Sequence, residues 1–150
     1  MSEITQTVRF ASDRQLIVTE QVKRIFLFGN TTVDGTYKNI TAGLETVKMG
    51  QVMGKVTATG KWVICKSAAV DGSAIPRAVS SEEITDATAA QEVLVSLIDG
   101  GEINKAGLVF NGADTLDTLV GGVRMEDLLI ANSRSLSLKT ITDTAGFGNY

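Results

Sequence analysis

The residues that could carry acid–base chemistry are few, because the chain contains no histidine. Histidine is the usual general base near neutral pH and the commonest metal ligand. A catalytic site would therefore have to use carboxylates, lysine or the single cysteine, Cys65. A glycosidase, for example, needs two carboxylates that face each other across a cleft. The acidic candidates are Glu82 and Glu83, together with the set Glu92, Asp99 and Glu102.

None of these candidates fits the geometry of an active site. Adjacent residues of a strand point to opposite sides, so Glu82 and Glu83 make a poor pair in an extended segment. Asp99 and Glu102 flank a glycine turn, where polar residues are expected for solvation alone. Cys65 follows the apolar residues 62–64, where a small buried side chain is the ordinary interpretation. We therefore predict that the chain is not an enzyme and has no catalytic, cofactor-binding or metal-binding residues.

Composition limits the remaining possibilities. A chain of 150 residues is the size of one domain, and one cysteine cannot form an internal disulfide. No apolar run approaches the roughly 18 residues of a membrane-spanning helix, and the N-terminal residues lack the pattern of a signal peptide. Because of the missing apolar run, a membrane is not an expected partner. No basic cluster alternates with aromatic residues, so nucleic acid is not an expected partner either.

The net charge of −3 is unevenly distributed along the chain. Residues 1–66 carry a net charge of +4 and residues 67–150 carry −7. This polarity suits contacts between copies of the chain. Two solvated faces with no joint role are an equally good interpretation.

Short strands separated by glycine-rich turns dominate the middle of the sequence. Residues 52–56 alternate with period two, Gly60 supplies a tight turn, and residues 61–65 resume the alternation. Asp71 and Gly72 form a second turn signal, after which residues 75–79 can add a third strand. Fifteen glycines and a single proline in such a pattern predict a mainly β, barrel-like domain.

Further elements are expected on both sides of this region. Residues 24–40 predict a hairpin that turns at Asp34 and Gly35, and residues 92–98 predict a central strand that ends at a turn over 99–101. Asp114 can cap a short helix that stops at Gly121, and an apolar stripe predicts a second helix around residues 125–132. Residues 135–141 alternate again and predict a last strand.

Many of these pieces, each weak alone, occur in an order and spacing that resemble one family. The matching segments are residues 17–20, 50–55, 59–61, 71–76, 101–104 and 108–112. Together they resemble the bacteriophage head decoration proteins, small cementing proteins typified by the one on the lambda capsid. Against this pattern, residues 24–40 form an insertion and residues 113–150 a C-terminal extension.

The resemblance implies a fold and a role. The fold would be a small β-barrel-like (β-tulip-like) domain over residues 15–150, with one or two short helices and an extended N-terminal arm over residues 1–14. The role would be that of a structural protein of the virion, made in the host cytoplasm and bound as a homotrimer to the outer surface of the assembled head. There it would clamp neighbouring subunits of the major capsid protein.

A different virion module remains an alternative. A tail or baseplate barrel, or a glycan-binding attachment domain, uses similar short strands. An exposed aromatic platform around Trp62 or Tyr37 would favour glycan binding.

Two groups of residues are candidates for contacts. The arm, as an extended segment, can add a strand to the sheet of a partner. The alternative interpretation is a frayed terminus without function. Aromatic residues within 24–40 and in the C-terminal tail are candidates for subunit contacts. They can also pack within their own chain. The capsid-contact candidates are Ile4, Val8 and Phe10, and the subunit-contact candidates are Phe26, Phe28, Phe147 and Tyr150.

Overall fold

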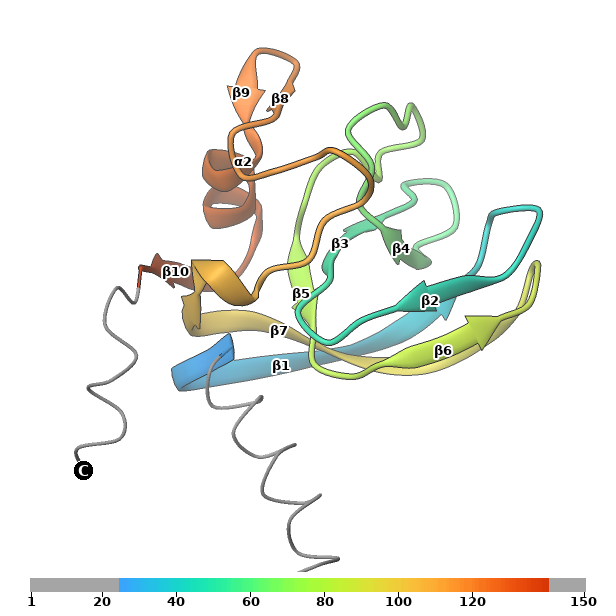
Figure 1. Cartoon of the computed structure of the whole chain (residues 1–150), viewed down its shortest axis with the longest axis horizontal. Coiled ribbons are helices and arrows are strands. Elements are labelled where there is room, and N and C mark those ends of the chain that lie inside the picture. The colour runs from blue at the N-terminus through green and yellow to red at the C-terminus, as the bar shows by residue number, and fades with distance from the viewer. Residues whose placement is uncertain (1–24, 141–150) are drawn as a thin grey trace, which may run out of the picture.

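The computed structural model describes residues 25–140 of the chain, and these residues form a mainly β fold (Figure 1). The prediction of a mainly β domain with a barrel-like sheet is confirmed. Its elements, in chain order, are β1 (Phe26–Lys38), β2 (Glu45–Val47), β3 (Val52–Lys55), β4 (Trp62–Ile64), β5 (Ala78–Ser80), β6 (Ile84–Ala87), β7 (Glu92–Asn104), the 3-10 helix η1 (Lys105–Gly107), β8 (Leu119–Val120), β9 (Val123–Arg124), α2 (Met125–Asn132) and β10 (Ser135–Lys139).

The main sheet closes into a ring of strands without becoming a regular barrel. The ring follows the order β1, β4, β3, β5 and β7, and β7 then pairs with β1. The β1–β4 junction is short, since the parallel pairing consists of Tyr37 opposite Trp62. β10 adds to the other side of β7 as a parallel strand. The two 13-residue strands β1 and β7 therefore form a long antiparallel ribbon that carries the rest of the fold.

The central hairpin and the strand after it are present as the sequence predicts. β3 and β4 pair antiparallel with Met53 opposite Ile64, and Gly60 in their loop has a φ of 71°. Asp71 accepts hydrogen bonds from the backbone N–H and hydroxyl of Ser73, and Gly72 has a φ of 98°. β5 then pairs with β3. Local turn chemistry is sufficient to define this part of the ring.

The predicted hairpin over residues 24–40 is wrong, because β1 is one continuous strand from Phe26 to Lys38. Gly35 lies in the middle of this strand instead of in a turn. A Cβ atom at Gly35 would be 2.3 Å from the indole Cδ1 and Nε1 atoms of Trp62. The glycine is therefore needed to admit the Trp62 ring against the backbone.

The predicted turn over residues 99–101 is also wrong, because β7 continues through both glycines to Asn104. Gly101 has a φ of 90°, and a Cβ there would be 2.6 Å from backbone atoms of Gly29 and Asn30 in β1. The register between β1 and β7 is irregular in this region. The glycines therefore allow a bulged, close approach of two backbones.

The C-terminal elements are partly as expected. The helix predicted after Asp114 is absent, because this carboxylate accepts hydrogen bonds from the backbone N–H and hydroxyl of Ser67, at 3.0 and 2.7 Å. Gly121 and Gly122 form the turn of the small β8–β9 hairpin, both with positive φ. The second predicted helix is present as α2, which buries Met125 and Leu129, and the last strand is present as β10. Residues 108–110 form no strand and contribute a single bridge, between Val109 and Gln51.

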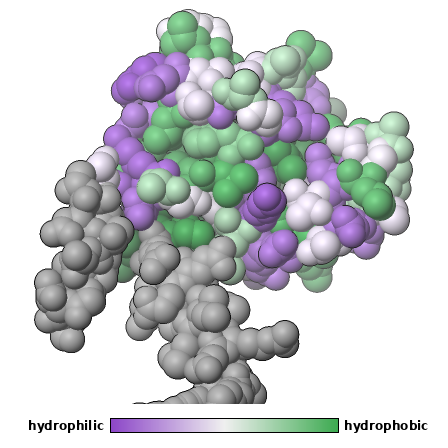
Figure 2. Space-filling model, in the orientation of Figure 1, coloured by the Kyte–Doolittle hydropathy of each residue, from purple (hydrophilic) through white to green (hydrophobic). Residues whose placement is uncertain are grey.

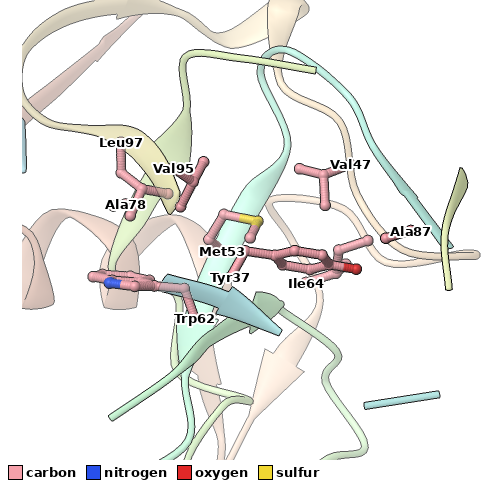
Figure 3. Close-up of a cluster of buried hydrophobic side chains, with 9 residues drawn as sticks. All are labelled: Tyr37, Val47, Met53, Trp62, Ile64, Ala78, Ala87, Val95 and Leu97. Carbon is pink, nitrogen blue, oxygen red and sulfur yellow. The ribbon is translucent and has the colours of Figure 1, made fainter. Parts of the chain in front are cut away.

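Three groups of buried side chains form the core. The largest joins the strands of the ring to the β2–β6 pair and is shown in Figure 3, where the Tyr37 hydroxyl is directed away from Trp62. It contains Tyr37, Val47, Met53, Trp62, Ile64, Ala78, Ala87, Val95 and Leu97. A second group joins the other half of the ribbon to α2 and β10 and contains Ile25, Val79, Ile98, Ile103, Leu129 and Leu136. A third joins β3 and the end of β4 to the start of α2 and contains Val52, Cys65 and Met125. Each large side chain buried in this way contributes about 1.5–3 kcal/mol.

Candidate functional site

Three of the five acidic side chains considered for acid–base chemistry are engaged in structural contacts. A carboxylate oxygen of Glu82 accepts a hydrogen bond from the backbone N–H of Ser96 at 2.7 Å. Glu92 forms an ion pair with Lys61 at 3.0 Å. Asp99 accepts a hydrogen bond from the Thr31 hydroxyl at 2.9 Å. Within residues 25–140, no three His, Cys, Asp or Glu side chains lie together in a way that could hold a metal ion.

Cys65 is buried, as the sequence predicts. Burial, followed by the nearby Asp114 carboxylate, raises the pKa of its thiol to about 12. The thiol faces the carbonyl oxygen of Ala74 at 3.4 Å. A protonated, enclosed thiol is a poor nucleophile at neutral pH, and Cys65 therefore serves as a core side chain.

The aromatic residues that would have favoured glycan binding are also buried. Tyr37 has no exposed surface and Trp62 is 7% exposed, both within the largest core group (Figure 3). The Tyr37 hydroxyl donates a 2.5 Å hydrogen bond to Glu45, and burial together with this carboxylate raises the pKa of Tyr37. Neither ring offers the exposed stacking platform that a glycan-binding site would need.

The end of the ribbon where the described chain begins and ends has a different character. Phe26 of β1 and Leu138 of β10 are both register partners of Ile103, on opposite sides of β7. The segments outside the described residues, 1–24 and 141–150, therefore both join the fold at this end. We call the end of the ribbon around Ile103, with its neighbours on β1 and β10, the terminal end.

An exposed aromatic side chain marks the terminal end. Phe28 is 75% exposed, whereas Phe26 is partly buried against the second core group. Phe28 lies opposite Glu102, whose neighbour on the other side is Ser137. Ile4, Val8, Phe10, Phe147 and Tyr150 lie outside the described residues. Of the predicted contact residues, the structure thus leaves Phe28 as an accessible apolar group at the terminal end.

Polar contacts hold the backbone next to Phe28. The Asn30 side-chain amide donates to the carbonyl oxygens of Gly100 and Glu102, each at 3.2 Å, and so bridges the two residues that flank Gly101. On the same strand, Thr31 donates to Asp99, which also pairs with Arg134 at 3.9 Å. These contacts were not predicted, because the sequence indicated a hairpin over residues 24–40 and a turn over residues 99–101 instead of two long paired strands. The sequence did contain a signal for them, because each of two apolar segments is followed by glycine, Gly29 after the first and Gly100 and Gly101 after the second.

Comparison with known protein families identifies the chain. The model of the family described as bacteriophage lambda head decoration protein D matches residues 25–118, from the first described residue to just before β8. The chain belongs to the head decoration family. No curated protein matches it in a direct search.

Membership of the head decoration family assigns a structural role to the chain, as a component of the phage virion that decorates the capsid. The ring and the bulge at Gly101 lie within the matched residues, whereas α2 and β10, and with β10 one side of the terminal end, lie beyond them. Among the described residues, no helix combines the length and the hydropathy that crossing a membrane requires.

Proposed function

We propose that this head decoration protein binds the outer surface of the assembled head as a homotrimer and clamps neighbouring subunits of the major capsid protein. The terminal end is the side that faces the capsid. The observation that carries the proposal is the convergence of both described ends of the chain beside Ile103. This convergence allows residues 1–24, residues 141–150 and the exposed Phe28 to act on one surface.

The physical basis of the clamp is burial of apolar side chains together with strand addition. The arm carries Ile4, Val8 and Phe10 two or four positions apart. An extended segment of this kind can pair with an open sheet edge, where backbone hydrogen bonds supply affinity and alternate side chains fill pockets. Weak contacts of this type become strong when several copies act together.

Deletion of residues 2–12 tests the arm. The variant should lose binding to heads assembled without the decoration protein, as measured by co-sedimentation, while its urea unfolding midpoint stays that of the full chain. A variant in which Ile4, Val8 and Phe10 are replaced by serine keeps the arm length and should lose most of the binding as well. Full binding by both variants would rule out the arm as the capsid contact.

The clamp itself has a separate test. DNA-filled heads saturated with the protein should survive heating to a higher temperature than undecorated heads, because the bound copies hold capsid subunits against the internal pressure. Quantitative mass spectrometry of purified particles should find nearly one copy for each major capsid subunit. A few copies per particle would instead indicate a tail or vertex component.

A further inference from the structure

The segment between η1 and β8 contains Asn111 followed directly by Gly112, which is the one Asn–Gly pair of the chain. The carbonyl oxygen of Asn111 accepts a hydrogen bond from the backbone N–H of Asp114 at 3.0 Å, and this bond closes a turn. Asn111 is partly exposed and Gly112 is exposed. The segment runs across the front of the molecule in Figure 1, so its outer side belongs to the surface that Figure 2 shows. Solvent therefore reaches the pair directly.

The two groups of this pair that could react with each other are free. Within residues 25–140, the Asn111 side chain makes no hydrogen bond, and neither does the N–H of Gly112. Each of the other four asparagines in this range has its side chain held in a hydrogen bond. They are Asn30, Asn39, Asn104 and Asn132. The fold thus leaves one asparagine side chain free to rotate, and it lies beside a free backbone nitrogen.

An asparagine followed by an unhindered glycine can lose ammonia. The glycine nitrogen attacks the side-chain carbon Cγ, the new N–Cγ bond closes a five-membered succinimide ring, and the Cγ–Nδ2 bond breaks. The proton of the glycine N–H leaves with the amide nitrogen as ammonia. Water then opens the ring. The product is aspartate when the N–Cγ bond breaks and isoaspartate when the bond to the main-chain carbonyl breaks.

We propose that Asn111 is a site of spontaneous deamidation in the folded protein and that the reaction opens the turn. Gly112 has no Cβ to obstruct its nitrogen, and nothing lies within 4 Å of the position that a Cβ would occupy. In isoaspartate the main chain runs through the former side chain. The carbonyl oxygen that accepts from the N–H of Asp114 then belongs to a carboxylate outside the main chain, and the hydrogen bond that closes the turn is lost.

The turn lies between two positions that are fixed to other parts of the fold. Before it, the N–H of Val109 donates to the carbonyl oxygen of Gly50 at 2.9 Å. After it, the Asp114 carboxylate accepts hydrogen bonds from the backbone N–H and the hydroxyl of Ser67, in the loop that follows β4. An additional main-chain carbon between these positions displaces Asp114 from Ser67. Deamidation should therefore release the loop over residues 66–70 and leave the ring of strands paired.

Peptide mapping measures the reaction at each asparagine separately. Trypsin cleaves after lysine and arginine, so residues 106–124 form one peptide whose single asparagine is Asn111. The other four described asparagines fall in four other peptides and serve as internal controls. The full chain is incubated at mildly alkaline pH, with a synthetic peptide of residues 106–124 as the unfolded reference. Mass spectrometry detects replacement of the amide by a carboxyl group, and chromatography separates the isoaspartate form.

The comparison with the free peptide decides whether the fold leaves the site reactive. Asn111 should convert in the folded chain at a rate within about tenfold of its rate in the free peptide, because an exposed turn opens at little cost. The other four asparagines should stay intact over the same time. A larger retardation by the fold, or equal conversion at all five asparagines, would overturn the proposal.

Two variants test the mechanism and its consequence. Gly112→Ala places a Cβ beside the attacking nitrogen, and Asn111→Gln requires a larger ring, so each should slow the conversion by roughly tenfold or more. In the converted chain, hydrogen exchange at the Ser67 amide should become faster while β7 stays protected. The Asn111→Gln chain, incubated in the same way, should show no change. Unaltered exchange at Ser67 after full conversion would show that the turn does not open.

Discussion

The two ends of the β1–β7 ribbon are built by opposite means. From Thr32 to Lys38 the strands pair in regular register, and the loops beyond them are arranged around the buried side chain of Asn39. Before Thr32 the register is irregular, and the shape depends on the absence of a side chain at Gly101. These loops, residues 39–44 and 87–91, form the loop end of the ribbon. The loop end should therefore be sensitive to removal of a side chain, and the terminal end to addition of one.

The largest effect is expected at the terminal end. Gly101→Ala would place a Cβ 2.6 Å from the backbone of β1, at a φ of 90°. Because backbone atoms cannot move aside as a flexible side chain can, we expect a loss of roughly 3 kcal/mol in the free energy of unfolding. Urea denaturation measures this loss. Gly112→Ala is the control, because Gly112 also has a positive φ, of 56°, but nothing lies within 4 Å of the added atom. Its loss should be about 1 kcal/mol, and equal losses would contradict the steric explanation.

The next effect is expected at the loop end. Asn39→Ala removes the acceptor for Thr41 and the donor to Gly43 and Ala87, and it leaves the carbonyl oxygen of the buried Ala87 without this partner. The expected loss is about 2 kcal/mol in the free energy of unfolding, again from urea denaturation. Amide hydrogen exchange should also become faster in residues 39–44 while β7 near Ile103 stays protected.

A helix surface asparagine provides the control for this variant. Asn132 donates to the carbonyl oxygen of Leu128 within α2 and is only partly buried. Asn132→Ala should cost less than 1 kcal/mol. Equal losses in the free energy of unfolding for Asn39→Ala and Asn132→Ala would show that the loops do not depend on the hydrogen bonds of the Asn39 side chain.

The same contrast explains what the sequence could predict. The β3–β4 hairpin and α2 depend on neighbouring residues, and alternation, turn glycines and an apolar stripe were enough to find them. Gly35 and Gly101 were taken for turn residues because a glycine that admits a distant group looks identical to one that makes a turn. Their partners, Trp62 and the backbone at Gly29, are far away in the sequence. Asp114 was likewise taken for a helix cap, although its partner is Ser67.

The candidate surfaces were predictable to different degrees. Phe28 was selected as a contact residue from its aromatic character, and the structure leaves it exposed. The loop end was not predicted, since its two segments lie in separate parts of the sequence and become one region through the hydrogen bonds of Asn39. Composition alone does not show which short polar segments will lie side by side in the folded protein.

A smaller effect is expected from Cys65, which lies in neither end but in the third core group with Val52 and Met125. Burial raises the pKa of its thiol from 9.0 to about 12. Between these values the unfolded chain releases the proton and the folded chain keeps it. The stability that the protonated thiol contributes is therefore complete below pH 9 and is lost as pH rises toward 12. Between pH 7 and pH 10 the loss should be roughly 1 kcal/mol in the free energy of unfolding.

Cys65→Ala isolates this contribution. Urea denaturation of both proteins at pH 7 and pH 10 should show a decrease in the free energy of unfolding that is roughly 1 kcal/mol smaller in the variant. Tyr37, whose pKa burial also raises, contributes equally to both proteins and cancels in the difference. Asn39→Ala should keep the full pH dependence of the unaltered chain, because its effect is confined to the loop end. Identical pH dependence with and without the thiol would show that Cys65 is not buried as described.

The smallest effect on stability is expected at Phe28, where the terminal end meets solvent. Phe28→Ser removes a side chain that is 75% exposed, so the free energy of unfolding should stay within about 0.5 kcal/mol. Phe26→Ser, two positions earlier, should cost more than 1 kcal/mol because Phe26 packs against the second core group. Co-sedimentation with undecorated heads should rank the variants in the opposite way, with the larger loss of binding per folded molecule for Phe28→Ser. If Phe28→Ser bound heads as well as the unaltered chain, the exposed aromatic ring would not be part of the capsid contact, and the terminal end would act through its arm alone.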